Sequence, residues 1–261
     1  IGGLTLQPSE LAKLGVILCF SSLICRMRGR MSTFKYGILP FAAILGLVVG
    51  LLVLEPHFSA SIIIIAVGGV MMFLGGVKLG WFIGAGSAAA VGIGVLLMLF
   101  PYASGRINTW RDPFSSSSDE GYQIVQSLYT IGSGGLSGLG LGMSRQKYLY
   151  LPEEHNDFIF SVVCEELGFI GAALILLLFA LLILRGYWIA LHCRDRFSFL
   201  VVAGITTLLA IQVFLNVAVV TNLVPCTGIS LPFFSYGGTA LLIQLGEMGI
   251  ILSASRDVIE K

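Results

Sequence analysis

Charged residues are scarce in this chain. Lys, Arg, Asp and Glu make up 11% of its 261 residues, whereas hydrophobic residues make up 56%. A soluble domain of this length could not cover its surface with so few charged side chains, so the composition excludes soluble classes and favours a polytopic membrane protein. The formal net charge is only +1, which gives no sign of a nucleic-acid partner.

Cysteine and histidine are also few. The five cysteines include no Cys-x-x-Cys pair, and the three histidines show no spacing typical of metal ligands. A disulfide framework and a zinc site are therefore not indicated. The chain opens on IGGLTLQPSE, without Met and without a signal-peptide pattern, which we interpret as the start of a fragment of a longer protein.

Long apolar runs take the place of the missing charge. Each supplies about 15–25 residues, enough at about 1.5 Å per residue to cross about 30 Å of hydrocarbon, although the first and third are short. We therefore predict an all-α membrane protein with a single integral membrane domain over residues 1–261. The predicted spans are 10–25, 37–54, 61–76, 81–100, 158–184, 198–221 and 238–254.

The basic residues predict the orientation of these spans. Ten of the fifteen Lys and Arg lie in alternate connections and at the C-terminal tail, whereas the connections 55–60 and 222–236 contain none. The positive-inside rule assigns the basic ends to the cytoplasm, so residues 101–157 form a large external loop. The ten are Arg26, Arg28, Arg30, Lys35, Lys78, Arg185, Arg194, Arg196, Arg256 and Lys261.

A connection as long as 101–157 is more often functional than a mere linker. Within it, GYQIVQSLYTIG (121–132) has apolar residues at helical spacing and predicts an amphipathic helix at the membrane interface. The next stretch, GSGGLSGLGLG (132–142), has too much glycine for a helix. It predicts a re-entrant or hinge loop, or a backbone that approaches a phosphate or a sugar.

The densest group of acids lies where this loop enters the fifth span, in YLYLPEEHNDFIFSVVCEELG (148–168). Asp157 stands at the external end of the span, where partial burial would make its carboxylate a better base near neutral pH. The alternative is that Asp157 only caps the helix, because negative charge suits a helix N-terminus; the spacing favours neither. The acids at 153–154 fit a solvated rim, whereas Glu165 and Glu166 lie deeper, where acids face a polar interior.

Other polar residues lie inside the spans. Lys13 follows Glu10 by three residues, so an ion pair along one helix is the simplest interpretation. Gln212 and Asn216 are expected to hydrogen-bond to neighbouring helices. Glu247 has no obvious cationic partner in the sequence. The broken, apolar connection NLVPCTGISLPFFSYGG (222–238) is expected to wall the same external cleft as Asp157.

Three of these stretches together carry a family pattern: QPSELAKL (7–14), the loop sequence from Gly121 to Gly171, and PCTGISLPFFSYGG (225–238). The chain resembles the SEDS family of bacterial cell-wall polymerases, the RodA/FtsW/SpoVE group, and is more similar to the FtsW/SpoVE branch. The resemblance implies ten spans with both termini in the cytoplasm of a bacterial plasma membrane, of which this chain would lack the first three.

The resemblance also implies a function. Members polymerise peptidoglycan glycan strands from lipid II, with release of undecaprenyl pyrophosphate, alongside a single-span class B penicillin-binding protein. Asp157 matches the family's catalytic aspartate, and Glu10 matches a glutamate implicated in function. Two features depart from the family pattern: His57 replaces an acid, and HNDF replaces HTDF before the fifth span.

The chemistry of glycan transfer fits one positioned carboxylate. Asp157 would take the proton of an acceptor hydroxyl, while cationic side chains hold the leaving pyrophosphate. No cofactor is certain; a divalent cation, Mg or Mn, bound through Asp157 could share this work. The candidate substrate-binding residues are Glu10, Lys13, Arg106, Arg111, Gln123, Gln126, Arg145, Lys147 and Ser235. The alternatives are a lipid II flippase, for which Glu247 would line the route, and a non-catalytic scaffold for the penicillin-binding protein.

Overall fold

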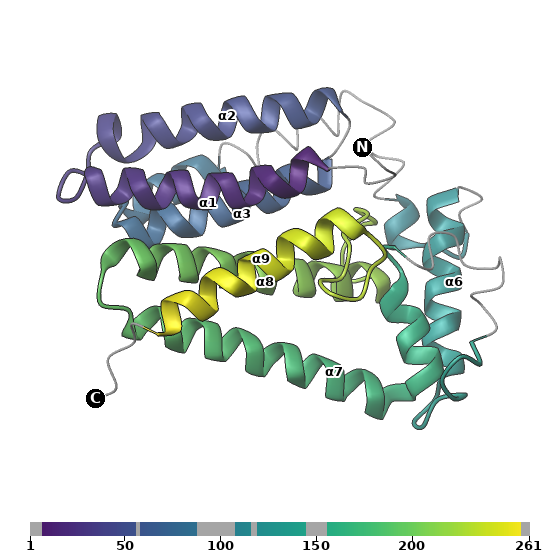
Figure 1. Ribbon diagram of the computed structural model, residues 1–261. Helices are drawn as coiled ribbons and strands as arrows, with labels where there is room; N and C mark the ends of the chain where they lie inside the picture. The colour runs from purple at the N-terminus through teal and green to yellow at the C-terminus, as the bar shows by residue number, and fades with distance from the viewer. Residues whose placement is uncertain (1–6, 56–57, 88–107, 116–118, 145–155, 257–261) are drawn as a thin grey trace, which may run out of the picture. The chain divides into compact units, whose positions relative to one another are not determined.

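The computed structural model describes residues 7–55, 58–87, 108–115, 119–144 and 156–256 (Figure 1). These residues form helices and connections, and no strand occurs among them. Five of the helices in the described part are long and apolar enough to cross a membrane, and a sixth apolar helix is shorter. The prediction of an all-α polytopic membrane protein is confirmed.

The chain divides into two compact units. Unit 1 comprises residues 1–83, 180–211 and 237–261, and unit 2 comprises residues 84–179 and 212–236. Two long helices, α7 (Ile159–His192) and α8 (Arg196–Val220), therefore contribute to both units. The other helices of unit 1 are α1 (Pro8–Arg26), η1 (Phe34–Ile38), α2 (Leu39–Leu54), α3 (Phe58–Gly75) and α9 (Gly238–Ser255).

The start of α1 follows from its sequence. Pro8 occupies the first turn, where its missing N–H would have had no helical partner and its fixed φ suits the helix. Glu10 lies in the first turn and Arg26 in the last, and each charge complements the helix dipole at its own end. The helix has 19 residues, which corresponds to a length of about 28 Å, close to the thickness of the hydrocarbon layer.

Close packing holds unit 1 together. Helices α1, α2 and α3 run side by side (Figure 1), and the rings of Phe20 on α1 and Phe41 on α2 meet edge to face at 4.8 Å. Gly204 on α8 lies so close to Ile17 and Met71 that an added Cβ would displace one of them. Small residues at such crossings let helices approach in a membrane, where the hydrophobic effect does not drive their association.

Unit 2 contains α6 (Asp119–Ser133), the first part of α7, the end of α8 and the broken segment 221–236. Gly168 interrupts α7 with φ 67° and ψ −172°, a backbone conformation open mainly to glycine. The whole of α7 would be about 51 Å long, more than a bilayer core needs, whereas residues 169–192 alone give about 36 Å. The break therefore separates a short entry helix, residues 159–167, from the membrane-length part.

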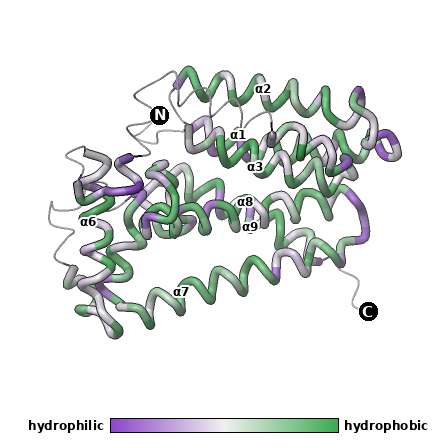
Figure 2. The backbone as a smooth tube through the Cα atoms, turned by 180° about the vertical axis from the view of Figure 1, so that it is seen from behind, coloured by the Kyte–Doolittle hydropathy of each residue, from purple (hydrophilic) through white to green (hydrophobic). Residues whose placement is uncertain are grey.

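The helices lie over the predicted apolar segments, but the fifth, predicted as 158–184, extends to His192 and is interrupted at Gly168. The π-helical turn η1 extends the second segment back to Phe34, and residues 79–87 are helical at the start of the fourth, whose residues 88–100 lie outside the described part. Figure 2 shows the hydropathy along the chain: the helices are mostly green, and the connections between α1 and α2 and between α7 and α8 are purple.

Candidate active site

Asp157 lies in the turn that leads directly into α7. Residues 156–158 form this turn, and the first helical residue is Ile159. The Asp157 side chain is partly exposed, whereas the neighbouring Phe158 is buried with 1% of its surface exposed. The buried phenylalanine fixes the turn to unit 2, and the neighbouring Asp157 remains partly exposed.

Two side chains hold the backbone of this turn. The Asn216 Nδ2 group on α8 donates to the Asp157 carbonyl oxygen at 2.8 Å and to the Ile229 carbonyl oxygen at 2.6 Å. The Ser235 hydroxyl donates to the Asn156 carbonyl oxygen at 2.6 Å and accepts from the Leu231 N–H at 2.7 Å. Both anchors also bind the broken segment, so this segment and the turn at Asp157 are neighbours. That the two wall a common external cleft stays a prediction.

Helix α6 ties the entry helix to the end of α8. The Ser127 hydroxyl donates to the Val220 carbonyl oxygen at 2.8 Å and lies 2.7 Å from the Ser161 hydroxyl. A serine has one proton to donate, so Ser161 is the donor between the two hydroxyls. Ser127 and Ser161 are both completely buried. The polar groups on the buried face of α6 are therefore hydrogen-bonded. Through Ser161, four residues after Asp157, they hold the first turn of α7 in place.

The glycine-rich stretch, residues 134–142, packs against the break in α7; we call it the glycine loop. At the break, two carbonyl groups and two amide groups of α7 have no partner within the helix. The glycine loop supplies a partner for each of them. The Leu139 and Gly140 N–H groups donate to the carbonyl oxygens of Glu165 and Glu166, both at 3.0 Å. In return, the amides of residues 169 and 170 donate to the carbonyls of residues 135 and 136 at 2.9 and 3.2 Å. All four backbone groups are thereby satisfied.

Glycine is required where these backbones meet. A Cβ at Gly138 or Gly168 would collide with the main chain of the other segment. Of the two interpretations of the glycine run, a hinge-like loop packed on protein agrees with the described structure. The contact also explains why the sequence offers so little side-chain volume here.

Glu165 and Glu166 bind the same loop. The buried Glu165 carboxylate accepts from the Ser133 hydroxyl at 3.2 Å and from the Ser144 hydroxyl. The Glu166 carboxylate accepts from the Gly142 N–H at 2.9 Å and from the Ser144 N–H at 3.2 Å. Both acids precede the break at Gly168. They therefore lie in the entry helix rather than deep within the membrane-length part, which corrects the depth expected from the sequence.

Arg111, Gln123 and Gln126 are further predicted site residues that lie in unit 2. Arg111 is exposed beside Trp110, whose indole N–H donates to the Asn222 carbonyl oxygen at 3.1 Å. The Asn222 Nδ2 group donates back to the Trp110 carbonyl oxygen at 3.2 Å, which joins this turn to the end of α8. Gln123 and Gln126 are half-buried on α6. Arg106, Arg145, Lys147, Glu153, Glu154 and His57 lie outside the described residues.

Glu10 and Lys13 form the predicted ion pair in unit 1. The Lys13 Nζ lies 2.7 Å from the Glu10 Oε1, and Lys13 is only 4% exposed. Glu247 on α9 is buried as well, and both Lys13 and Glu10 interact electrostatically with its carboxyl. No cationic partner for Glu247 was expected from the sequence, and the structure places α9 beside α1, close enough for the Glu247 carboxyl to interact with Lys13. This interaction relates residues more than 230 positions apart, and no local signal in the sequence could have revealed it.

The chemistry available at Asp157 is that of a single carboxyl group. In the described part of the chain, no three His, Cys, Asp or Glu side chains gather closely enough to hold a metal ion by themselves. Three buried oxygens in this unit, Asn216 Oδ1, Asn222 Oδ1 and Thr227 Oγ1, have no hydrogen-bond partner among the described residues. Buried polar atoms are rarely left unpaired, so a substrate hydroxyl or a water would satisfy them.

The family model described as "Cell cycle protein", FtsW/RodA/SpoVE, matches residues 1–259. The chain belongs to this family. Among similar curated proteins, the FtsW/RodA/SpoVE relative "Stage V sporulation protein E" of Bacillus subtilis (strain 168) is 40% identical over 256 residues. That match covers 98% of this chain and 70% of the relative. A "Probable peptidoglycan glycosyltransferase FtsW" of Geobacter sp. (strain M18) is 40% identical over 253 residues, which are 97% of this chain and 69% of the relative.

Solved structures of the FtsW/RodA/SpoVE type agree in fold. A chain from a peptidoglycan synthase complex, studied for its coordination of polymerization and crosslinking, superposes with a TM-score of 0.81 at 32% identity. The match covers all of this chain and 73% of that one. The crystal structure of the Thermus thermophilus rod shape determining protein RodA gives a TM-score of 0.65 at 30% identity, over 100% and 69% of the two chains. The predicted resemblance is confirmed.

Proposed function

We propose that this chain is a peptidoglycan glycosyltransferase that extends glycan strands from lipid II and releases undecaprenyl pyrophosphate. Relatives named as peptidoglycan glycosyltransferases cover almost the whole chain. The structural observation that carries the proposal is the anchored turn at Asp157, whose backbone is held by Asn216 while its side chain stays accessible.

The Asp157 carboxylate acts as the general base in this proposal. It takes the proton of the acceptor sugar hydroxyl as that oxygen attacks the anomeric carbon of the donor, and the bond to the pyrophosphate oxygen breaks. Attack from the face opposite the leaving group inverts the anomeric carbon. The leaving pyrophosphate is a stable anion and needs positive charge rather than a proton, so one carboxyl suffices. Arg111 is the described candidate for that charge, with Arg106, Arg145 and Lys147 from the sequence.

A divalent cation is compatible with this site only if the substrate supplies part of its coordination. A single carboxylate with substrate phosphate oxygens and waters is a common Mg²⁺ environment, and Asp157 would provide that carboxylate. Such an ion would neutralise charge on the leaving pyrophosphate. Chelation with EDTA would then lower the polymerisation rate and added Mg²⁺ or Mn²⁺ would restore it, whereas an unchanged rate would leave Asp157 as a base alone.

The setting follows from the substrate. The chain is a multi-pass membrane protein, and a lipid-linked sugar must be met at the membrane surface. We infer that Asp157 faces the outside of the bacterial cytoplasmic membrane, because the basic connections of the sequence mark the opposite side. The synthase complex that resembles this chain supports a crosslinking partner, for which we propose a single-span class B penicillin-binding protein. The names of the relatives support a role in division, shape or sporulation.

Strand synthesis from purified lipid II, by the full-length protein with its partner, tests this function. Asp157→Ala should abolish glycan strands on a gel while the protein still folds and binds the partner. Glu247→Gln is the matched control, since it removes a buried acid from unit 1 and leaves the proposed base intact. A flippase would show the reverse dependence in a lipid II translocation assay. Strands of normal length and yield from Asp157→Ala would refute the enzymatic function.

A further inference from the structure

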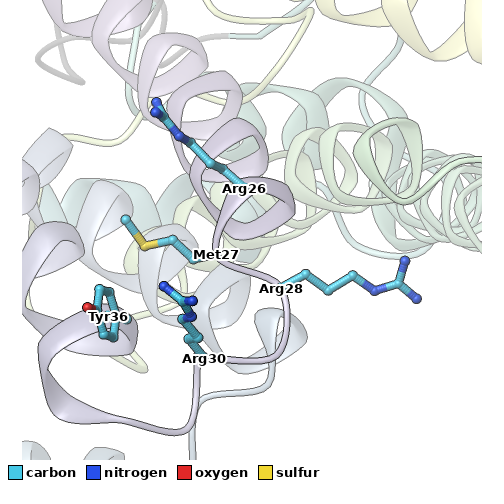
Figure 3. A pocket seen from close by; sticks show the side chains of 5 residues that line it. All are labelled: Arg26, Met27, Arg28, Arg30 and Tyr36. Carbon is cyan, nitrogen blue, oxygen red and sulfur yellow. The ribbon is translucent and has the colours of Figure 1, made fainter.

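A pocket of about 410 Å³ opens in unit 1 where α1 ends and η1 begins (Figure 3). Its volume falls in the range of small-ligand sites. In Figure 3 the Arg30 guanidinium lies beside the Tyr36 ring, and the other two arginines extend from the same turn in different directions. The lining residues are Arg26, Met27, Arg28, Arg30 and Tyr36.

The pocket is strongly cationic. Within the described part of the chain, none of its three arginines forms an ion pair with a carboxylate. Arg30 lies over the Tyr36 ring at 5.5 Å, and Lys35 approaches the same ring at 5.9 Å. The three exposed arginines place three positive charges on one short segment, and a bound anion would offset part of that charge. The planar guanidinium fork suits phosphate oxygens in particular.

The turn that carries the arginines has a defined backbone. The Met27 N–H donates to the Leu23 carbonyl oxygen at 2.8 Å, and the Arg30 N–H donates to the Met27 carbonyl oxygen at 3.0 Å. At the far end, the Gly37 N–H donates to the Thr33 carbonyl oxygen at 2.7 Å. Successive turns therefore fix the pocket floor, whereas the exposed arginine side chains remain able to close on a ligand. The positive-inside rule requires only charge at this end, not a pocket built on ordered backbone.

The pocket lies at the depth of lipid head groups. Arg26 is the last residue of α1, whose length of about 28 Å matches the hydrocarbon core, so the following turn emerges in the head-group layer. Aromatic residues mark the same level: Phe34 and Trp81 pack with ring centroids 5.3 Å apart. Aromatic side chains of this kind concentrate at membrane interfaces, where head-group phosphates also lie.

We propose that this pocket binds the phosphate of an anionic phospholipid head group, such as phosphatidylglycerol, through Arg26 and Arg30, with Arg28 closing over it. Binding would fix the α1–α2 connection to the membrane surface. The proposal is independent of the glycosyltransferase activity, since no residue of the pocket takes part in the chemistry at Asp157. The group that the pocket recognises is a phosphate. A soluble phosphate compound could therefore compete with the lipid head group.

Native mass spectrometry of the full-length protein, titrated with phosphatidylglycerol or phosphatidylcholine, tests the proposal. Arg26→Gln with Arg30→Gln should lower the affinity for phosphatidylglycerol by about fivefold for each arginine removed, and leave phosphatidylcholine unaffected. The control pair, Arg194→Gln with Arg256→Gln, removes the same charge from exposed positions at other helix ends. It should retain most of the affinity.

Three outcomes would overturn the proposal. An equal loss in the pocket pair and the control pair would mean that diffuse positive charge, not the pocket, attracts the lipid. Displacement of phosphatidylglycerol by millimolar glycerol 3-phosphate would mean that the ligand is a soluble phosphate. Full affinity in the pocket pair would exclude these arginines. Arg26→Lys with Arg30→Lys keeps the charge and the fold, and a partial loss in that variant would support guanidinium recognition.

Discussion

Replacement of Asn216 by leucine should impair catalysis without removing any catalytic group. Leucine is close to asparagine in size but donates no hydrogen bond. Asn216 is completely buried, and its Nδ2 group serves both the Asp157 and the Ile229 carbonyl oxygens. The substitution therefore leaves two partly or wholly buried acceptors without their donor at the base of the candidate site.

The size of the effect follows from those two bonds. A buried polar group that loses its partner costs about 1–3 kcal/mol, so the native arrangement would lose about 2–6 kcal/mol if the backbone stayed in place. The turn at Asp157 can lower this cost by moving toward other donors. A displacement of about 1 Å is enough to reduce the rate of an oriented reaction by about 100-fold. We therefore expect kcat to fall by about 10–100-fold, with a small change in KM.

Initial rates of strand formation at varied lipid II concentration would separate the change in kcat from the change in KM. Thr221→Val, in the turn directly after the same helix, is the matched control, because the Thr221 hydroxyl donates at 2.7 Å to the carbonyl of Val217. Asn216→Gln keeps the amide donor and should recover part of the rate. If Asn216→Leu kept a normal kcat in a folded protein, or if Thr221→Val lost as much, Asn216 would not be the positioning residue for Asp157.

Two further substitutions test the buried contacts away from Asp157. Lys13→Met should destabilise the protein by up to about 3–5 kcal/mol, because the partly buried Glu10 loses its ion-pair partner and the buried Glu247 loses a cation that interacts with it. Adding Glu247→Gln should restore part of the melting temperature; no recovery in the double variant would contradict the cluster. Gly168→Ala should cost at least about 1–3 kcal/mol and most of the activity, since alanine is strained at this φ and meets the glycine loop. Gly246→Ala, at an exposed helical position with open space around it, should be neutral or slightly stabilising in the same thermal melt.

The sequence predicts well whatever is local or periodic. The apolar segments are long enough to be recognised as helices, and the Glu10–Lys13 pair follows from a spacing of three residues within one helix. The helical spacing in α6 is also correct. It could not show which side is buried, because the buried face carries Ser127 and Thr130 while Tyr122 and Tyr129 are exposed. Hydrogen bonds make that polar face acceptable in the interior: Ser127 pairs with Ser161 and Val220, and the Thr130 hydroxyl donates to the Gln126 carbonyl oxygen.

The sequence placed the broken segment near Asp157, but it could not identify the individual contacts between distant segments. The glycine run excludes a helix, but its sequence does not indicate that it will hydrogen-bond to the carbonyls of residues 165–166. Asn216 was expected to hydrogen-bond within the protein, and the structure adds that one acceptor is the backbone of Asp157. Ser235 was expected to bind substrate. Its hydroxyl donates to the backbone of the same turn, and a contact with substrate stays a prediction.

The isosteric variant Asp157→Asn offers the most direct test. Asparagine keeps the shape and the backbone anchors of the turn, but its side chain cannot accept a proton from the attacking sugar hydroxyl. General-base catalysis typically contributes about 10²–10⁴ to a rate, so the turnover of purified lipid II should fall by at least about 100-fold while lipid II still binds. Turnover close to that of the unmodified protein would show that another group removes the proton.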